Sequence, residues 1–305
     1  MTSSDPVRAW RALMRAANGL GSRAAEALWA ASSGWAGRVL LRPPRRWTTS
    51  GRERVLVIAA HADDEAMGCA GTVIRHSQAG DLVRIAIVTD GARSKAHGID
   101  AVSMRAIREQ EAKRAAAAMG APCDWIGLHE GDWSDAEGKA AVRRVMEEVA
   151  PTIVYAPSNI DYQVEHRRLA RLVGSLLGDL AAAPEVRIYA VQVPLTPLLV
   201  NLVHDVSDLE PSIDSVLRCY ATQQESISRT FRLRRYAARF YGVATQVEGF
   251  CALPAEIYSS LHQRTPSHFR ALYIRAWRDP LAAAVGSAER LSWRRKVRAA
   301  RNANG

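Results

Sequence analysis

The chain has 305 residues, of which 48% are hydrophobic and 24% charged, a composition typical of a globular protein. This length allows one large domain or two smaller ones, and it excludes disulfide-stapled, collagen-like and disordered chains. The net charge of +10 is concentrated at the ends, because residues 1–54 carry +7 and residues 289–305 carry +5. The body of the chain is near neutral, so we expect no nucleic-acid-binding core.

The four cysteines are widely spaced and form no CxxC pair, which indicates ordinary buried thiols in a reducing compartment. No stretch has the uninterrupted apolar core of a secretory signal, or the roughly 18 apolar residues that a membrane-spanning helix needs. We therefore expect a cytoplasmic protein. No feature of the sequence indicates an oligomeric state.

The chain begins with a region of helical periodicity at 5–41, rich in arginine, followed by a Pro- and Ser-containing linker. We predict three parts: a basic helical appendage and linker (1–50), a main domain (51–255) and a basic helical extension (256–305). One hypothesis is that both basic ends form amphipathic helices that lie on the inner face of an anionic membrane. The alternative is a solvated tail and a helix packed on the domain, since charge runs are usually solvated.

The main domain alternates apolar, β-branched runs with helix-like stretches. We predict strands at 54–60, 83–89, 124–128, 152–156 and 186–193, and helices at 66–78, 101–119, 135–149 and 165–180. This alternation indicates an α/β, Rossmann-like fold with a mostly parallel sheet and helices on both faces. Residues 209–240 are expected to be helical and to wall the site. In such sheets ligands bind outside the carboxyl ends of the strands.

The segment His61-Ala-Asp63-Asp64-Glu65 lies where the first strand ends and a helix begins. Acidic residues favour a helix N-terminus, but a histidine followed by three acids is more than helix capping requires. His61 and Asp64 can both point at one position above the sheet edge. They provide two of the three or so protein ligands that a zinc-type site needs.

A third ligand is expected from another strand end, and His166 follows the strand at 152–156. It opens a helix at the same edge of the sheet as His61. A lone histidine is more often structural than metal-binding, so the spacing of His166 alone leaves both interpretations open.

The two segments resemble the signatures of the PIG-L (LmbE-like) family of zinc-dependent N-acetylglucosaminyl de-N-acetylases. His61-Ala-Asp-Asp-Glu is similar to AHPDDE, with Ala62 in place of the usual proline, and Asp161-x-Gln163-x-Glu165-His166 is similar to D-x-H-x-D-H. The resemblance extends over about residues 54–253, including Arg108-x-x-Glu111 and Val247-Glu-Gly-Phe250.

The resemblance implies that His61, Asp64 and His166 are zinc ligands and that Asp63 is the general base. Such a site keeps one position open and lowers the pKa of a bound water toward about 7. Iron(II) or another divalent ion in place of zinc also suits two histidines and a carboxylate. Asp161 and Glu165 suit the role of orienting histidine ligands through their other nitrogen.

Arg108 matches a family arginine that contacts the sugar, and Glu130 stands where the family usually has an aspartate that binds sugar hydroxyls. The alternative for Arg108 is an exposed arginine on a helix surface. Gln163 replaces the first histidine of the second signature, which the family is thought to use in catalysis. Glutamine can donate a hydrogen bond but cannot give up a proton.

Three functional hypotheses follow. The first is a zinc-dependent hydrolase that removes the acetyl group from an N-acetylglucosamine-type conjugate, whether glycolipid, polysaccharide precursor or glycosylated metabolite. The second keeps the zinc enzyme but acts on a non-sugar amide, since a metal site does not fix the leaving amine. The third is a catalytically weak sugar-binding protein, motivated by Gln163.

Overall fold

The computed structural model describes residues 43–263 with gaps at 95–97, 159–160, 162, 192–194, 196–198, 225–226, 228–233, 235–236 and 239, together with residues 31, 295 and 299. The predicted N-terminal appendage up to residue 42 and the basic extension beyond residue 263 lie outside the described residues, apart from those three positions. Among the described helices, none is long and apolar enough to cross a membrane.

The described part of the chain builds one sheet in the order β1-β7-β8-β6-β5-β2-β3-β4. Its strands are β1 (Arg45–Arg46), β2 (Arg54–Ala59), β3 (Leu82–Thr89), β4 (Cys123–Leu128), β5 (Ile153–Ala156), β6 (Glu185–Ile188), β7 (Leu202–Asp205) and β8 (Val247–Pro254). Strands β4, β3, β2, β5 and β6 run parallel to one another. Strand β8 pairs antiparallel with β6 and β7. The prediction of an α/β fold with a mostly parallel sheet is confirmed.

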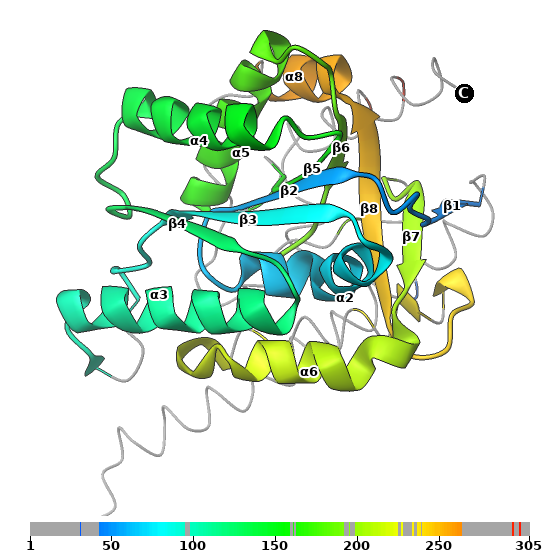
Figure 1. Ribbon diagram of the computed structural model, residues 1–305, viewed down its shortest axis with the longest axis horizontal. Coiled ribbons are helices and arrows are strands. Elements are labelled where there is room, and N and C mark those ends of the chain that lie inside the picture. Colours follow the sequence, from blue (N-terminus) through cyan, green and yellow to red (C-terminus); the bar gives the residue numbers. More distant parts are fainter. Residues whose placement is uncertain are drawn as a thin grey trace, which may run out of the picture.

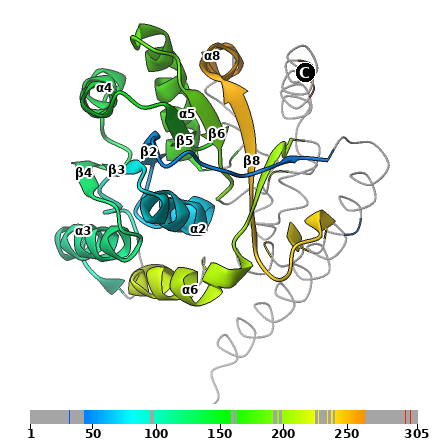
Figure 2. The same ribbon diagram turned by 45° about the vertical axis from the view of Figure 1, so that its right-hand side comes forward.

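Helices cover both faces of this sheet, as predicted. They are α2 (Asp64–Ala79), α3 (Ala101–Ala118), α4 (Asp135–Val149), α5 (Val164–Leu176), α6 (Glu210–Arg218) and α8 (Ala255–Gln263), with short 3₁₀ turns at Leu177–Asp179, Ser207–Leu209 and Ala221–Gln223. Figure 1 shows α2, α3 and α6 on one face and α4, α5 and α8 on the other, and Figure 2 shows the same two layers from the side.

The alternation of side chains along β2 explains the two layers. Val55 and Val57 are buried in the cluster that α2, α3 and α6 complete, whereas Leu56 and Ile58 are buried with α4, α5 and α8. A central parallel strand is therefore apolar at successive positions, because both of its faces are covered.

Three strands of the sheet, β1, β7 and β8, were not predicted from the sequence. Strands β7 and β8 extend the sheet beyond β6, at positions for which we predicted no strand. Arg45 and Arg46 lie in the predicted linker but pair with β7 as the edge strand β1. Within 209–240, the expected helical structure is present as α6 at 210–218.

The order of the strands places the site. The chain runs from β2 outward to β3 and β4 on one side, and from β5 to β6 on the other. The strand order therefore reverses between β2 and β5, which is the topological switch point where α/β sheets bind ligands beyond the carboxyl ends of their strands. His61 follows β2 and His166 follows β5, so both lie at this point.

Helix α2, which carries the first motif, is interrupted at Cys69, where φ is −155° and ψ is 27°. After the interruption, the N–H groups of Gly71 and Thr72 donate to the buried carboxylate of Glu248, at 3.0 and 2.8 Å. Arg234 donates to the carbonyl of Met67 before the interruption, and its Nη2 lies 3.2 Å from Glu248 Oε1. An ion pair from the C-terminal part of the chain thus caps both sides of the break.

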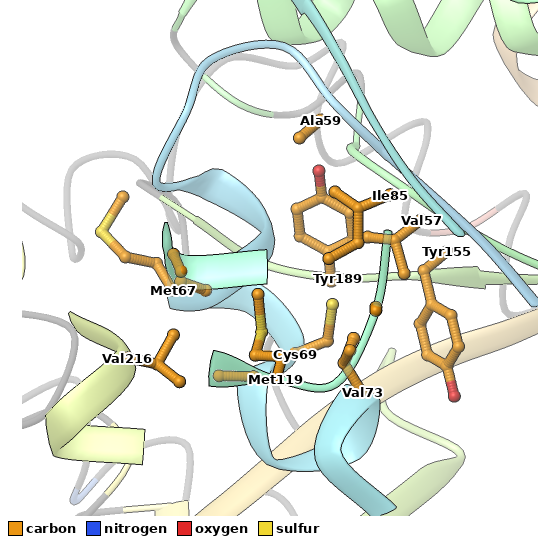
Figure 3. Close-up of a cluster of buried hydrophobic side chains, with 14 of the residues drawn as sticks. Val57, Ala59, Met67, Cys69, Val73, Ile85, Met119, Tyr155, Tyr189 and Val216 are labelled. Atoms are coloured by element: carbon orange, nitrogen blue, oxygen red, sulfur yellow. The ribbon is translucent and has the colours of Figure 1, made fainter. Parts of the chain in front are cut away.

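The same helix lies close to the sheet. A Cβ at Gly68 would lie 2.3 Å from the ring of Tyr189, so only glycine permits this approach. Figure 3 shows the Tyr189 ring beside Cys69 and Val73 of α2, and its hydroxyl donates to the carbonyl of Ile58 at 2.8 Å. The first turn of α2 is therefore held firmly against the carboxyl end of β2.

Candidate metal centre and catalytic site

The turn between β2 and α2 presents the residues of the first motif. The backbone N–H of His61 donates to Asp64 Oδ2 at 2.8 Å, which closes the turn on the side chain that starts the helix. Between them, Asp63 has a φ of 126°, a conformation that non-glycine residues rarely adopt. Its backbone N–H donates to Glu65 Oε2 at 3.2 Å. The local chain is strained at the residue that the family resemblance identifies as the general base.

The second motif lies after β5, at the start of α5. Gln163 is the N-cap residue of this helix and is half-buried, and its N–H donates to Asp161 Oδ1 at 3.0 Å. His166, in the first turn, is 1% exposed and faces the first motif. The helix start therefore points an imidazole toward His61 and Asp64.

Three atoms from these motifs form a small triangle. His61 Nδ1 lies 3.4 Å from Asp64 Oδ2 and 3.1 Å from His166 Nε2, and His166 Nε2 lies 3.1 Å from Asp64 Oδ2. Ligands at about 2.0–2.1 Å from a tetrahedral zinc ion lie about 3.3 Å from one another. The donor set and its spacing therefore fit a metal ion of the zinc type.

The other nitrogen of each histidine faces a carboxylate. His166 Nδ1 lies 3.2 Å from Asp161 Oδ2, and His61 Nε2 lies 3.4 Å from Glu130 Oε1. Carboxylates in this place fix the tautomer of a metal-binding histidine. Glu165 has a different contact, since its Oε2 accepts a hydrogen bond from Trp133 Nε1 at 2.7 Å.

The pKa values of His61, Asp64 and His166 are shifted by burial and by the charges of their neighbours. Burial lowers the pKa of His61, but the carboxylates of Asp64 and Glu130 outweigh this effect and raise the pKa to about 9. The pKa of His166 is raised well above its usual range because Asp64 and Asp161 outweigh its burial. Both histidines in turn keep the pKa of Asp64 below its usual range despite burial of the carboxyl.

Asp63 is 5% exposed and lies beside the triangle. Burial raises the pKa of this carboxyl to about 6, and the guanidinium of Arg108 opposes the rise. Arg108 Nη2 lies 3.4 Å from Asp63 Oδ1 and donates to the carbonyl of Ala62. Arg108 is 3% exposed, so the alternative of an exposed arginine on a helix surface does not apply.

Residues that follow α6 contact two buried carboxyl groups near the site, Glu65 and Glu111. The hydroxyl of Tyr220 donates to Glu65, whose pKa is raised to about 7 because burial disfavours the charged form. Thr222 donates to the buried carboxylate of Glu111 through its N–H at 3.0 Å and its hydroxyl at 2.8 Å. We did not predict a role for Glu65 in the site. The sequence did contain a signal, because three acidic residues follow His61 and helix capping does not require all of them.

The match to a family model agrees with the motifs. The PIG-L family, described as GlcNAc-PI de-N-acetylase, matches residues 56–177, which include both motifs, Arg108 and Glu130. The resemblance stated from the sequence is confirmed. PIG-L proteins are deacetylases, which hydrolyse amides, and the matched segment places the chain among such enzymes.

Solved structures share the fold. The N,N'-diacetylchitobiose deacetylase of Pyrococcus horikoshii is 19% identical, with a TM-score of 0.59 over 67% of this chain and 85% of that one. The A40926 pseudoaglycone deacetylase Dbv21 is 16% identical, with a TM-score of 0.55 over 66% and 98%. GalB, a 4-carboxy-2-hydroxymuconate hydratase from Pseudomonas putida, is 18% identical, with a TM-score of 0.59 over 65% and 95%. The fold thus supports more than one reaction.

Proposed function

We propose that this chain, whose residues 56–177 form a PIG-L family domain, removes an N-acetyl group from an N-acetylglucosamine-type sugar conjugate with the help of a bound metal ion. The observation that carries the proposal is the triangle of His61 Nδ1, Asp64 Oδ2 and His166 Nε2 with the buried carboxylate of Asp63 beside it. We propose 51–255 as the extent of the deacetylase domain, which includes every strand of the sheet except the two-residue edge strand β1.

His61, Asp64 and His166 would hold the ion, and zinc suits their nitrogen and oxygen donors, although another divalent ion also fits. An ion bound there supplies Lewis acidity toward the amide carbonyl and toward a water molecule. Asp161 and Glu130 face the outer nitrogens of the two histidines.

Asp63 moves the proton in this scheme. Its carboxylate takes a proton from the attacking water and returns it to the nitrogen of the departing amine as the amide C–N bond breaks. Burial raises the pKa of this carboxyl in the metal-free chain, and proton transfer is most efficient when the catalytic pKa lies near the working pH. The products are acetate and a free amino sugar.

Gln163 and Arg108 complete the proposal. The side-chain amide of Gln163 would donate a hydrogen bond to the oxyanion that forms during attack, in the place of the family histidine. Arg108 is proposed at the substrate side of the site through its proximity to Asp63, as the resemblance implies.

A sugar substrate is favoured by two names: the family is described as GlcNAc-PI de-N-acetylase, and the Pyrococcus horikoshii enzyme of the same fold is an N,N'-diacetylchitobiose deacetylase. An amidase acting on a non-sugar conjugate would use the same metal and the same base. A weak enzyme that mainly binds sugar is the remaining alternative, and Gln163 is the residue that favours it.

The test uses the full chain in metal-free and metal-loaded form. Acetate release is measured on N-acetylglucosamine, on its glycoside and lipid conjugates, and on a non-sugar acetamide. We expect one equivalent of metal to bind, and acetate release from the sugar conjugates to disappear with a chelator and in His166→Ala. Release from the acetamide alone would favour the amidase, and sugar binding without acetate release would favour the weak enzyme.

A further inference from the structure

The carboxylate of Glu130 has both oxygens engaged. Oε1 lies 3.4 Å from His61 Nε2, and Oε2 accepts a hydrogen bond from the backbone N–H of Arg93 at 3.2 Å. The side chain is only 20% exposed. These two contacts within the protein, one of them with His61, set the direction of the carboxylate.

The backbone of Glu130 is fixed as firmly as its carboxylate. Its N–H donates to Asp90 Oδ1 at 3.0 Å, and the same carboxylate accepts the N–H of Ala92 at 3.1 Å and contacts His129 Nδ1 at 2.9 Å. Asp90 is 1% exposed and follows β3, whereas Glu130 follows β4. Asp90 thus connects the end of β3 to the end of β4. It fixes the backbone of Glu130 where the side chain reaches His61, which follows β2.

Chain length decides what this carboxylate reaches. An aspartate at position 130 would be shorter by one methylene group, about 1.5 Å, and would lose the contact with His61 Nε2. A histidine that binds metal through Nδ1 must carry its proton on Nε2, and an acceptor at that proton selects this tautomer. Glu130 lies where such an acceptor is needed.

We propose that Glu130 is a positioning residue that holds His61 in the tautomer and orientation for metal binding, and that it is not a hydroxyl-binding contact of the sugar. The inference rests on the proposed function, because it takes His61 to be a metal ligand. Each of the two histidines then has one carboxylate at the nitrogen that faces away from the metal site: Asp161 at His166, and Glu130 at His61.

The test is a competitive zinc titration of the metal-free full chain, with KM and kcat measured separately at saturating metal. We expect Glu130→Ala and Glu130→Asp to weaken zinc affinity about 10- to 100-fold, and Glu130→Gln, which keeps an acceptor, to weaken it less. We expect KM for the sugar conjugate to stay within about twofold of wild type.

Asp132→Asn is the matched control, because it removes the same charge two residues away from an exposed side chain. It should leave zinc affinity unchanged and so exclude a general charge effect. Unchanged zinc affinity in Glu130→Ala together with a raised KM would overturn the inference and leave the proposed function intact. Failure of the wild-type chain to bind zinc would instead overturn the proposed function.

Discussion

The backbone conformation of Asp63 depends on contacts with residues that are distant in the sequence. Its φ of 126° implies local strain of about 1–3 kcal/mol, which the surrounding structure must offset. Arg108, 45 residues away on α3, supplies one such contact through the carbonyl of Ala62 and the Asp63 carboxylate. The motif predicts Asp63 as a site residue. The strain cannot be predicted, because the contacts that maintain it come from the tertiary structure.

Among the departures of this chain from the family signatures, Gln163 replaces a histidine that the family is thought to use in catalysis. We expect Gln163→His to raise kcat about tenfold or more, because an imidazole can transfer a proton as well as donate a hydrogen bond. The measurement is acetate release at saturating substrate, with bound zinc quantified in both proteins. An unchanged kcat would show that the amide already supplies what the reaction needs or that the side chain points elsewhere.

His262, on α8, is fully buried and remote from the two motifs in sequence. Burial lowers its pKa to about 4 from the usual 6.5. Between these values the unfolded chain binds a proton that the folded chain does not, so His262 makes the free energy of unfolding fall as the pH falls.

We expect His262→Gln to reduce the pH dependence of the unfolding free energy by about 1.4 kcal/mol per pH unit between about pH 6 and 5. Urea unfolding at several pH values measures this slope. His129→Gln, whose side chain is 57% exposed, is the control. Equal slopes in wild type and His262→Gln would contradict the expectation.

At the scale of elements, strands β2, β3, β4 and β5 and the helices between them can be predicted closely from the sequence, whereas β6 ends at Ile188, short of the predicted 193. Strand β2 and helix α4 show why: one is apolar at successive positions, and the other begins with a Ser134 capping box. Strand β8 has no such signal, because Glu248 and Gly249 lie within it. The buried carboxylate of Glu248 accepts hydrogen bonds from the backbone of helix α2. This contact joins residues far apart in the sequence, so the local sequence around Glu248 does not predict it.

The interruption of α2 leads to a prediction about stability. Glu248→Gln leaves the buried guanidinium of Arg234 without its counter-charge, so we expect the free energy of unfolding to fall by about 3–5 kcal/mol. The double variant Glu248→Gln/Arg234→Met should recover part of this loss, because neither charge then remains buried. Denaturant unfolding of the three proteins is the measurement.

Arg45→Met provides the comparison, since it breaks an ion pair with Glu185 whose arginine is 62% exposed. Exposed pairs contribute about 0–1 kcal/mol, so this variant should be nearly neutral. A Glu248→Gln protein as stable as Arg45→Met would show that the buried pair does not hold the two halves of α2.

At the scale of the whole molecule, the sequence predicts which strand ends carry the chemistry, and the structure brings His61, Asp64 and His166 to one point. Both motifs follow strands that meet at the switch point of the sheet. The contact of Glu130 with His61 and that of Tyr220 with Glu65 could not be predicted from the sequence. Glu130 and Tyr220 come from other elements, and their contacts depend on how the loops fold over the sheet.

The net charge of +10 belongs mainly to the two ends of the chain, most of whose residues lie outside the described part. If these ends contact an anionic membrane, the full chain should sediment with vesicles that contain phosphatidylglycerol and should be released by high salt. Vesicles of phosphatidylcholine are the control. The absence of salt-sensitive sedimentation would favour solvated ends.

The central claim is that Asp63 moves the proton in a metal-assisted amide hydrolysis. The most direct test compares acetate release by wild type and Asp63→Asn, each loaded with one equivalent of zinc, on an N-acetylglucosamine conjugate. The account predicts equal amounts of acetate and free amine from wild type, and a kcat lowered at least about 100-fold in Asp63→Asn with the zinc still bound. An Asp63→Asn protein as active as wild type would contradict it.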